Sequence, residues 1–93
     1  MEILKELNGH KGSFYIENDG ERQAEMTYTM AGQETLIIDH TEVGDALRGK
    51  GAGLQLVMAA VEYARANNIK IIPLCPFAKS VFDKKEEIRD VLR

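Results

Sequence analysis

Three glycines at alternate positions, Gly49, Gly51 and Gly53, separate two halves of the chain that have different hydrophobic periods. Residues 35–43 before them read as a strand, whereas residues 54–66 repeat apolar side chains at helical spacing. A glycine-rich turn that leads a strand into a helix directs backbone N–H groups and the helix dipole toward one point in space. Such a point attracts phosphate, so the sequence predicts a mixed α+β fold with an anion site at this turn.

Strand patterns fill the first half of the chain. Residues 13–17 and 21–30 are expected to pair through the turn Asn18-Asp19-Gly20, because these residues accept the positive φ angles of a hairpin. A second turn over residues 31–34 leads into the strand at 35–43. We therefore expect a three-stranded antiparallel meander, to which residues 1–12 could add a short strand.

The second half changes to helical spacing. Residues 54–66 are predicted to form a largely buried helix, and residues 69–75 a further strand. A strand–helix–strand unit makes a right-handed crossover, so this strand should lie parallel to residues 35–43. Pro73 cannot donate a ladder hydrogen bond, and pairing should therefore be broken or one-sided there.

Pro76 is suited to the first position of a helix, and we expect that short helix to run from Phe77 to about Lys85. A charged tail follows, in which Ile88, Val91 and Leu92 are spaced to cover a surface. At 93 residues the chain has room for one domain, residues 1–93, built as a mixed sheet with a crossover and a C-terminal helix.

Composition excludes several classes of function. The net charge of −3 argues against a general nucleic-acid binder, and no stretch approaches the length of a membrane-spanning helix. The single cysteine, Cys75, cannot form an internal disulfide and suits a reducing cytoplasm. Cysteines and histidines at metal-binding spacings are too few for a zinc site. We expect a monomer or weak dimer with no nucleic-acid or membrane partner.

The glycine turn differs from two commoner nucleotide loops. Lys50 is followed by Gly51 rather than by a magnesium-binding Ser or Thr, and the spacing is not that of the dinucleotide fingerprint. What remains is Arg48-x-x-Gly51-x-Gly53, which resembles the pyrophosphate loop of the GNAT superfamily of N-acetyltransferases. The similarity looks closest to small single-domain members, because His-Thr-Glu-Val stands at 40–43 and Pro-Leu-Cys-Pro-Phe at 73–77.

The resemblance implies that acetyl-coenzyme A is bound, with its pyrophosphate on the loop amides. Gly51 and Gly53 would let the backbone approach the phosphates, while Arg48 and Lys50 add charge. The family also splays two parallel strands apart for the pantetheine arm, and Pro73 would help to leave that gap. The alternative is that the glycines only form a tight turn. The residues expected to bind the cofactor are Val43, Arg48, Gly49, Lys50, Gly51, Ala52, Gly53, Leu54 and Lys79.

Acetyl transfer to an amine needs a deprotonated nucleophile, a polarised thioester carbonyl and a proton for the leaving thiolate. The resemblance implies that the main-chain N–H of Val43 polarises the carbonyl. His40 and Glu42 lie two residues apart, and we expect them on one strand face with Leu36 and Ile38. Either could take the proton of the amine, or both are ordinary solvated or half-buried strand residues.

Many members of the superfamily use a tyrosine of the last core helix as general acid, and Phe82 stands at that position here. Cys75 is the obvious replacement, because it should sit at a helix N-terminus with Lys79 one turn along, which lowers the pKa of a thiol. It could protonate the leaving thiolate or accept the acetyl group as a transient thioester. Alternatively, Cys75 is a buried small hydrophobe.

Two functions follow. The first is an N-acetyltransferase acting on an exposed amine of a small molecule or protein. The tight hairpin between the first two predicted strands leaves no room for the helices that build the acceptor pocket in larger members, so the acceptor site should be open. The second is a non-catalytic module that binds or senses coenzyme A or its acyl form, consistent with Phe82 in place of tyrosine.

Overall fold

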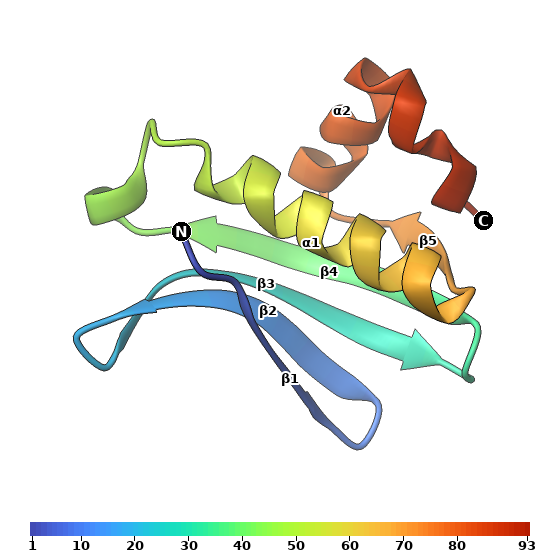
Figure 1. The fold of residues 1–93 in the computed structure, drawn as a ribbon, viewed down its shortest axis with the longest axis horizontal. Helices are drawn as coiled ribbons and strands as arrows, with labels where there is room; N and C mark the ends of the chain where they lie inside the picture. Colours follow the sequence, from blue (N-terminus) through green and yellow to red (C-terminus); the bar gives the residue numbers. More distant parts are fainter.

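A five-stranded sheet with α1 lying across it forms the body of the molecule (Figure 1). The computed structural model describes residues 1–93, and the strands lie in the order β1-β2-β3-β4-β5. The elements are β1 (Leu4–Asn8), β2 (Lys11–Asn18), β3 (Glu21–Ala31), β4 (Thr35–Val43), η1 (Asp45–Leu47), α1 (Ala52–Asn67), β5 (Lys70–Pro73), α2 (Pro76–Lys84) and η2 (Glu86–Val91). The predicted α+β fold with a β–α–β crossover is confirmed.

The antiparallel part of the sheet has four strands rather than the predicted three. β1 pairs with β2 over its whole length, from Leu4 opposite Tyr15 to Asn8 opposite Lys11. Its residues are mostly exposed because it is an edge strand, so no buried alternation marks it in the sequence. The Lys5 Nζ lies 4.3 Å from the centre of the Tyr63 ring and links this edge to α1.

β5 is short, and it leaves β4 early. The parallel pairing joins Thr35–Ile38 to Lys70–Pro73 and stops at the proline, as the missing N–H predicts. The chain then turns away, and the N–H groups of Leu74 and Cys75 both donate to the carbonyl of Ile38, at 3.1 and 3.2 Å. Residues 39–43 of β4 therefore have no pairing partner in β5, and a gap opens between the two strands beyond Ile38.

A β-bulge interrupts β4 beside β3. Tyr28 pairs with Ile38, but the preceding residue, Thr27, pairs with His40, so Asp39 is an extra residue in the strand. The Thr29 hydroxyl donates to the Asp39 carboxylate at 2.8 Å. Because of the extra residue, each side chain that follows it in the strand points to the opposite face of the sheet from the one that regular alternation predicts.

The consequence is a correction to the predicted facing of β4. Beyond the bulge, Thr41 and Val43 lie opposite buried residues of β3, and they continue the core face of the strand. His40 and Glu42 are exposed and occupy the other face of the sheet. The prediction that they share a face with the buried Leu36 and Ile38 is therefore wrong.

The helices close one core with the sheet. α1 begins two residues before the predicted start and ends where Asn68 adopts a left-handed conformation, with φ of 57°. η2 packs against α1 and α2, and its Ile88 and Val91 are buried, as their spacing predicts. None of these helices combines the length and the apolar character that crossing a membrane requires. The core comprises 21 residues, among them Phe14, Met26, Tyr28, Leu36, Ile38, Leu56, Val57, Val61, Ile71 and Phe82.

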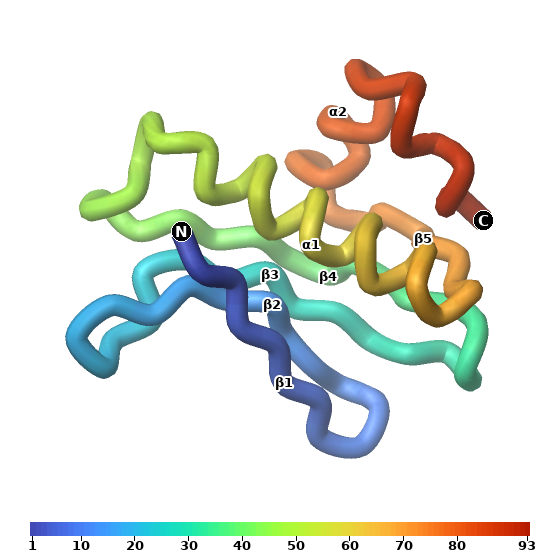
Figure 2. The backbone as a smooth tube through the Cα atoms, viewed as in Figure 1, coloured from blue at the N-terminus to red at the C-terminus, as the bar shows by residue number.

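The C-terminal end of the chain returns to β5 (Figure 2). Leu92 forms a parallel bridge with Ile71, and the N–H of Arg93 donates to the Ile71 carbonyl at 3.0 Å. Arg65 of α1 holds this segment by donating to the carboxylate of Asp90, at 2.7 and 3.0 Å. The outer edge of β5 is thereby covered by the chain itself.

Candidate functional site

The turn from β4 into α1 presents free backbone N–H groups. Gly49 and Gly51 have φ angles of 79° and 76°, in the left-handed region that favours glycine. Gly51 is the N-cap of α1 and no side chain caps the helix. The first helical hydrogen bond runs from Gln55 to the Gly51 carbonyl at 3.0 Å, so the N–H groups of residues 52–54 donate to no backbone acceptor.

The surroundings of these N–H groups fit an anion. A Cβ added at Gly49 or Gly51 would meet nothing within 4 Å, so a ligand can approach the backbone closely there. The helix dipole and the unpaired donors favour a phosphate group at this position. The Arg48 guanidinium lies 3.1 Å from the Asp45 carboxylate and is exposed beside the turn.

A pocket of about 310 Å³ adjoins the turn and contains most of the predicted cofactor-binding residues. Lys50 and Lys79 do not line it, and the Lys79 ammonium lies 3.5 Å from the Asp83 carboxylate. Its walls are largely apolar, which suits a pantetheine chain better than a second charged group. The lining consists of Val43, Leu47, Arg48, Gly49, Gly51, Ala52, Gly53, Leu54 and Phe77.

Gly53 lines this pocket and also contacts a side chain of the second helix. It is buried, and a Cβ there would lie 2.7 Å from the Cζ atom of Phe77. The Phe77 ring therefore packs directly against Gly53 at the start of α1, whereas Gly49 and Gly51 leave the backbone open to a ligand. The contact depends on a residue 24 positions further along the chain, so local sequence does not reveal it.

Cys75 is buried where β5 passes into α2, and it is the N-cap residue of that helix. Its thiol donates to the hydroxyl of Thr41, with a distance of 3.4 Å from Sγ to Oγ1. Burial raises the pKa of the thiol, whereas the Thr41 hydroxyl and the N–H groups of Ala78 and Phe77 lower it. The lowering is the larger effect, so the pKa of the thiol lies below its usual value. Thr41 escaped the sequence analysis because the bulge that orients it has no sequence signature.

His40 and Glu42 stand away from Cys75, on the opposite face of β4. Glu42 lies directly across from Glu25 and lines a small hollow of about 140 Å³. His40 lies across from Thr27 and lines a separate hollow of about 370 Å³. The structure therefore brings neither side chain to the thiol, and it exposes both on the face of the sheet opposite α1.

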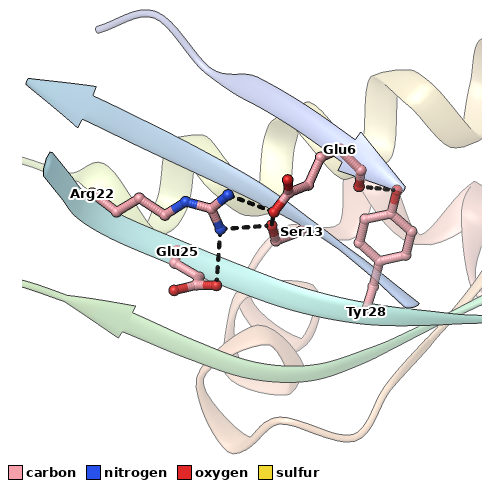
Figure 3. A network of polar contacts seen from close by, with 5 residues as sticks. All are labelled: Glu6, Ser13, Arg22, Glu25 and Tyr28. Carbon is pink, nitrogen blue, oxygen red and sulfur yellow. Dashed lines mark hydrogen bonds and ion pairs between the residues drawn. The ribbon is translucent and has the colours of Figure 1, made fainter. Parts of the chain in front are cut away.

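A polar network orders this exposed face next to Glu42 (Figure 3). The Arg22 guanidinium donates to the side chains of Glu6, Ser13 and Glu25, and the bond to Arg22 lowers the pKa of Glu6. On the core face of the sheet, the Tyr28 hydroxyl reaches from β3 past β2 to donate to the Glu6 carbonyl at 3.2 Å. These contacts hold β1, β2 and β3 in register where they flank the two hollows.

Phe82 lies in the core and not at a reaction centre. Only 1% of its surface is exposed, and it packs with Ala78, Val81 and Ile88 in the same cluster as the sheet. A phenyl ring carries no proton to donate, so Phe82 cannot be a general acid.

Known proteins share this arrangement. A GCN5-like protein from Staphylococcus aureus, solved by NMR in solution, matches with a TM-score of 0.74 and 41% identity over 99% of this chain and 87% of its own. An aminoglycoside N-acetyltransferase solved in complex with CoA has the same fold, with a TM-score of 0.57, 14% identity and coverage of 83% and 67%. Protein NATD1 of Xenopus tropicalis is 34% identical over 53 residues, which are 57% of this chain and about half (49%) of that protein.

The family model for the GCN5-related N-acetyl-transferase matches residues 13–91, which include most of β2, the whole of β3, β4 and β5, both α-helices and the turn at the start of α1. The match therefore spans the site as well as the fold. The chain belongs to the GCN5-related N-acetyltransferase family.

Proposed function

We propose that this protein binds acetyl-coenzyme A and transfers its acetyl group to an exposed amine of a small molecule or protein. The observation that carries the proposal is the uncapped start of α1, whose free N–H groups open onto an apolar pocket that reaches Val43 at the end of β4. Family membership supports acetyl-coenzyme A as the donor. When bound, the cofactor supplies an activated thioester.

The groups that bind the acetyl donor and the candidate bases lie on opposite faces of β4. The N–H groups of residues 52–54 hold the pyrophosphate, with Arg48 and Lys50 adding charge from the exposed rim. The main-chain N–H of Val43 polarises the thioester carbonyl. On the open face, Glu42 or His40 takes the proton of the incoming amine, directly or through water.

Cys75 acts on the side of β4 where acetyl-coenzyme A, the acetyl donor, binds. Its thiol lies beside the unpaired part of β4, and its lowered pKa favours the thiolate. In that form it accepts the acetyl group from the thioester, and the leaving coenzyme A thiolate takes up a proton from water. The amine then attacks the acetyl carbon, the bond to the Cys75 sulfur breaks and Cys75 leaves as the thiolate, and the proton of the amine passes through water to the base on the open face.

The acceptor site is open. β1 and β2 are joined by the two-residue turn Gly9–His10, and β2 and β3 by Asp19–Gly20, so no helix stands over the face that carries His40 and Glu42. Such a surface suits an amine that projects from a larger molecule. We place the reaction in the cytoplasm, as a monomer or weak dimer without nucleic acid, because a free cysteine and an acidic net charge suit that setting.

A second function is favoured by Phe82. The position that would carry a tyrosine acid is a buried phenylalanine, which is what a module that only binds or senses coenzyme A would tolerate. Such a module needs the loop and the apolar pocket but neither Cys75 nor Glu42.

Intact-mass spectrometry during titration with acetyl-coenzyme A separates these functions. Acetyl transfer through the thiol predicts a mass increase of one acetyl group, which is absent in Cys75→Ala. Incubation with lysine-containing peptides should then yield acetylated peptide, at a rate reduced in Glu42→Gln and unchanged in Glu62→Gln, an exposed carboxylate on α1. Binding without transfer to any amine would establish the sensing module, and no binding of coenzyme A would refute both.

A further inference from the structure

Thr41 contacts the one thiol of the protein from the neighbouring strand. Its hydroxyl oxygen lies 3.4 Å from Cys75 Sγ, across the gap that opens where β5 leaves β4. Thr41 is half-buried, whereas Cys75 is 4% exposed. In the thiol form the S–H group donates to the hydroxyl, and in the thiolate form the hydroxyl donates to sulfur.

The other groups around the sulfur are backbone donors. Cys75 precedes Pro76 at the start of α2, and the N–H groups of Phe77 and Ala78 point back toward the thiol. Among nearby titratable groups, His40 and Glu42 face the other side of β4, and Lys79 pairs with Asp83. The Thr41 hydroxyl is thus the one side-chain group that forms a hydrogen bond with the thiol.

The bulge in β4 is the reason that Thr41 reaches the sulfur. Thr41 lies opposite the buried Met26, and Val43 lies opposite the buried Ala24, so both belong to the core face. If Asp39 were paired as an ordinary strand residue, strict alternation from Ile38 would direct His40 to that face and Thr41 to the open one. The Thr29 hydroxyl bonds to the Asp39 carboxylate and supports the irregular conformation.

We propose that Thr41 is a positioning residue that orients the Cys75 thiol and stabilises its thiolate. The inference rests on the proposed function, in which that thiolate attacks the thioester. The new bond joins Cys75 sulfur to the acetyl carbon, the bond to the coenzyme A sulfur breaks, and the leaving thiolate takes up a proton. A hydroxyl that donates to the attacking sulfur keeps it deprotonated and aimed into the gap between β4 and β5.

The test compares Thr41→Val, which has nearly the same shape without the hydroxyl, with Thr41→Ser, which keeps it. Because the chain has a single cysteine, its thiolate absorbance in the ultraviolet reports the pKa directly, with Cys75→Ala as the baseline. Thr41→Val should raise the apparent pKa by about one pH unit, so that thiolate at neutral pH falls about tenfold. Thr41→Ser should restore most of the loss.

Thr27→Val is the matched control, because Thr27 is a half-buried threonine on the opposite face of the same sheet. The thiol titration of Thr27→Val should match that of the wild type. Thermal melts should show that all three variants are folded at the temperature of the titration. In acetyl transfer, Thr41→Val should lower kcat and leave the KM for acetyl-coenzyme A unchanged. An identical thiol titration in Thr41→Val and the wild type would overturn the inference.

The titration needs no acetyl donor, so it separates this inference from the proposed function. A shifted pKa in a protein that transfers no acetyl group would support the role of Thr41 in holding the thiol and would refute the acetyltransferase proposal alone. Active transfer with an unshifted pKa would refute the role of Thr41 alone.

Discussion

Replacing Gly51 by alanine tests the turn at the start of α1. Gly51 has a φ of 76°, and an added Cβ would meet nothing within 4 Å, so the whole cost of the change is conformational. A left-handed conformation costs an alanine about 1–2 kcal/mol relative to glycine. Alanine also lowers the conformational entropy of the unfolded chain, which offsets part of this cost. We therefore expect a net loss of about 1 kcal/mol in the free energy of unfolding.

Gly32→Ala provides the matched control. Gly32 has a φ of 73°, again with nothing within 4 Å of an added Cβ, but it lies in the turn between β3 and β4 at the other end of the sheet. Its conformational cost is the same. In a domain of this size each variant should melt about 4–8 °C below the wild type, as measured by circular dichroism.

Only the change at Gly51 should affect binding. Residue 51 sets the direction of the N–H groups that follow it, and an alanine Cβ there would occupy open space beside the expected phosphate. We expect this methyl group to displace the phosphate from its best position at a cost of about 1 kcal/mol, which weakens coenzyme A about fivefold in a calorimetric titration. Equal affinities for Gly51→Ala and Gly32→Ala would refute the assignment of the phosphate to this turn.

Three further outcomes follow from the core and the ion pairs. Phe82→Tyr should destabilise the protein by about 1–3 kcal/mol in urea and add no acetyl transfer, because its hydroxyl would be buried in an apolar cluster. Leu56→Ala removes a fully buried side chain and should cost about 2–5 kcal/mol, with unchanged stability counting against the described core. The hydrogen bond from Arg65 lowers the pKa of Asp90, so Asp90→Asn should be less stable than the wild type near neutral pH. The difference in the free energy of unfolding between Asp90→Asn and the wild type should shrink as the pH falls through the lowered pKa. Urea titrations that give the same difference at every pH would contradict a stabilising ion pair.

The periodicity of the sequence was sufficient for the general fold. The strand ending at Val43, the helix that follows the glycines and the break at Pro73 were all predicted correctly, because each depends on local rules of alternation, helical spacing or a missing N–H. The free N–H groups at the start of α1 follow from the same kind of rule, since the first turn of an uncapped helix leaves its donors unpaired.

What escaped prediction depends on contacts between distant segments. A bulge is a difference of one residue between two paired strands, so the facing of Thr41 and Glu42 could be known only once β3 and β4 were aligned. The role of Gly53 likewise depends on Phe77, which belongs to another helix. Both features concern the direction of side chains, and both fall beside the proposed reaction centre, where the sheet departs from regular pairing.

The brief pairing of β5 with β4 also bears on the order in which the protein folds. β1 to β4 are joined by tight turns and can pair early, since closing short loops costs little entropy. β5 pairs with only four residues of β4, across the connection that contains α1, so we expect the gap beyond Ile38 to be among the last features to form. Coenzyme A held in that gap would then contact groups that are still unformed in the transition state, and we expect it to slow unfolding while leaving the folding rate nearly unchanged.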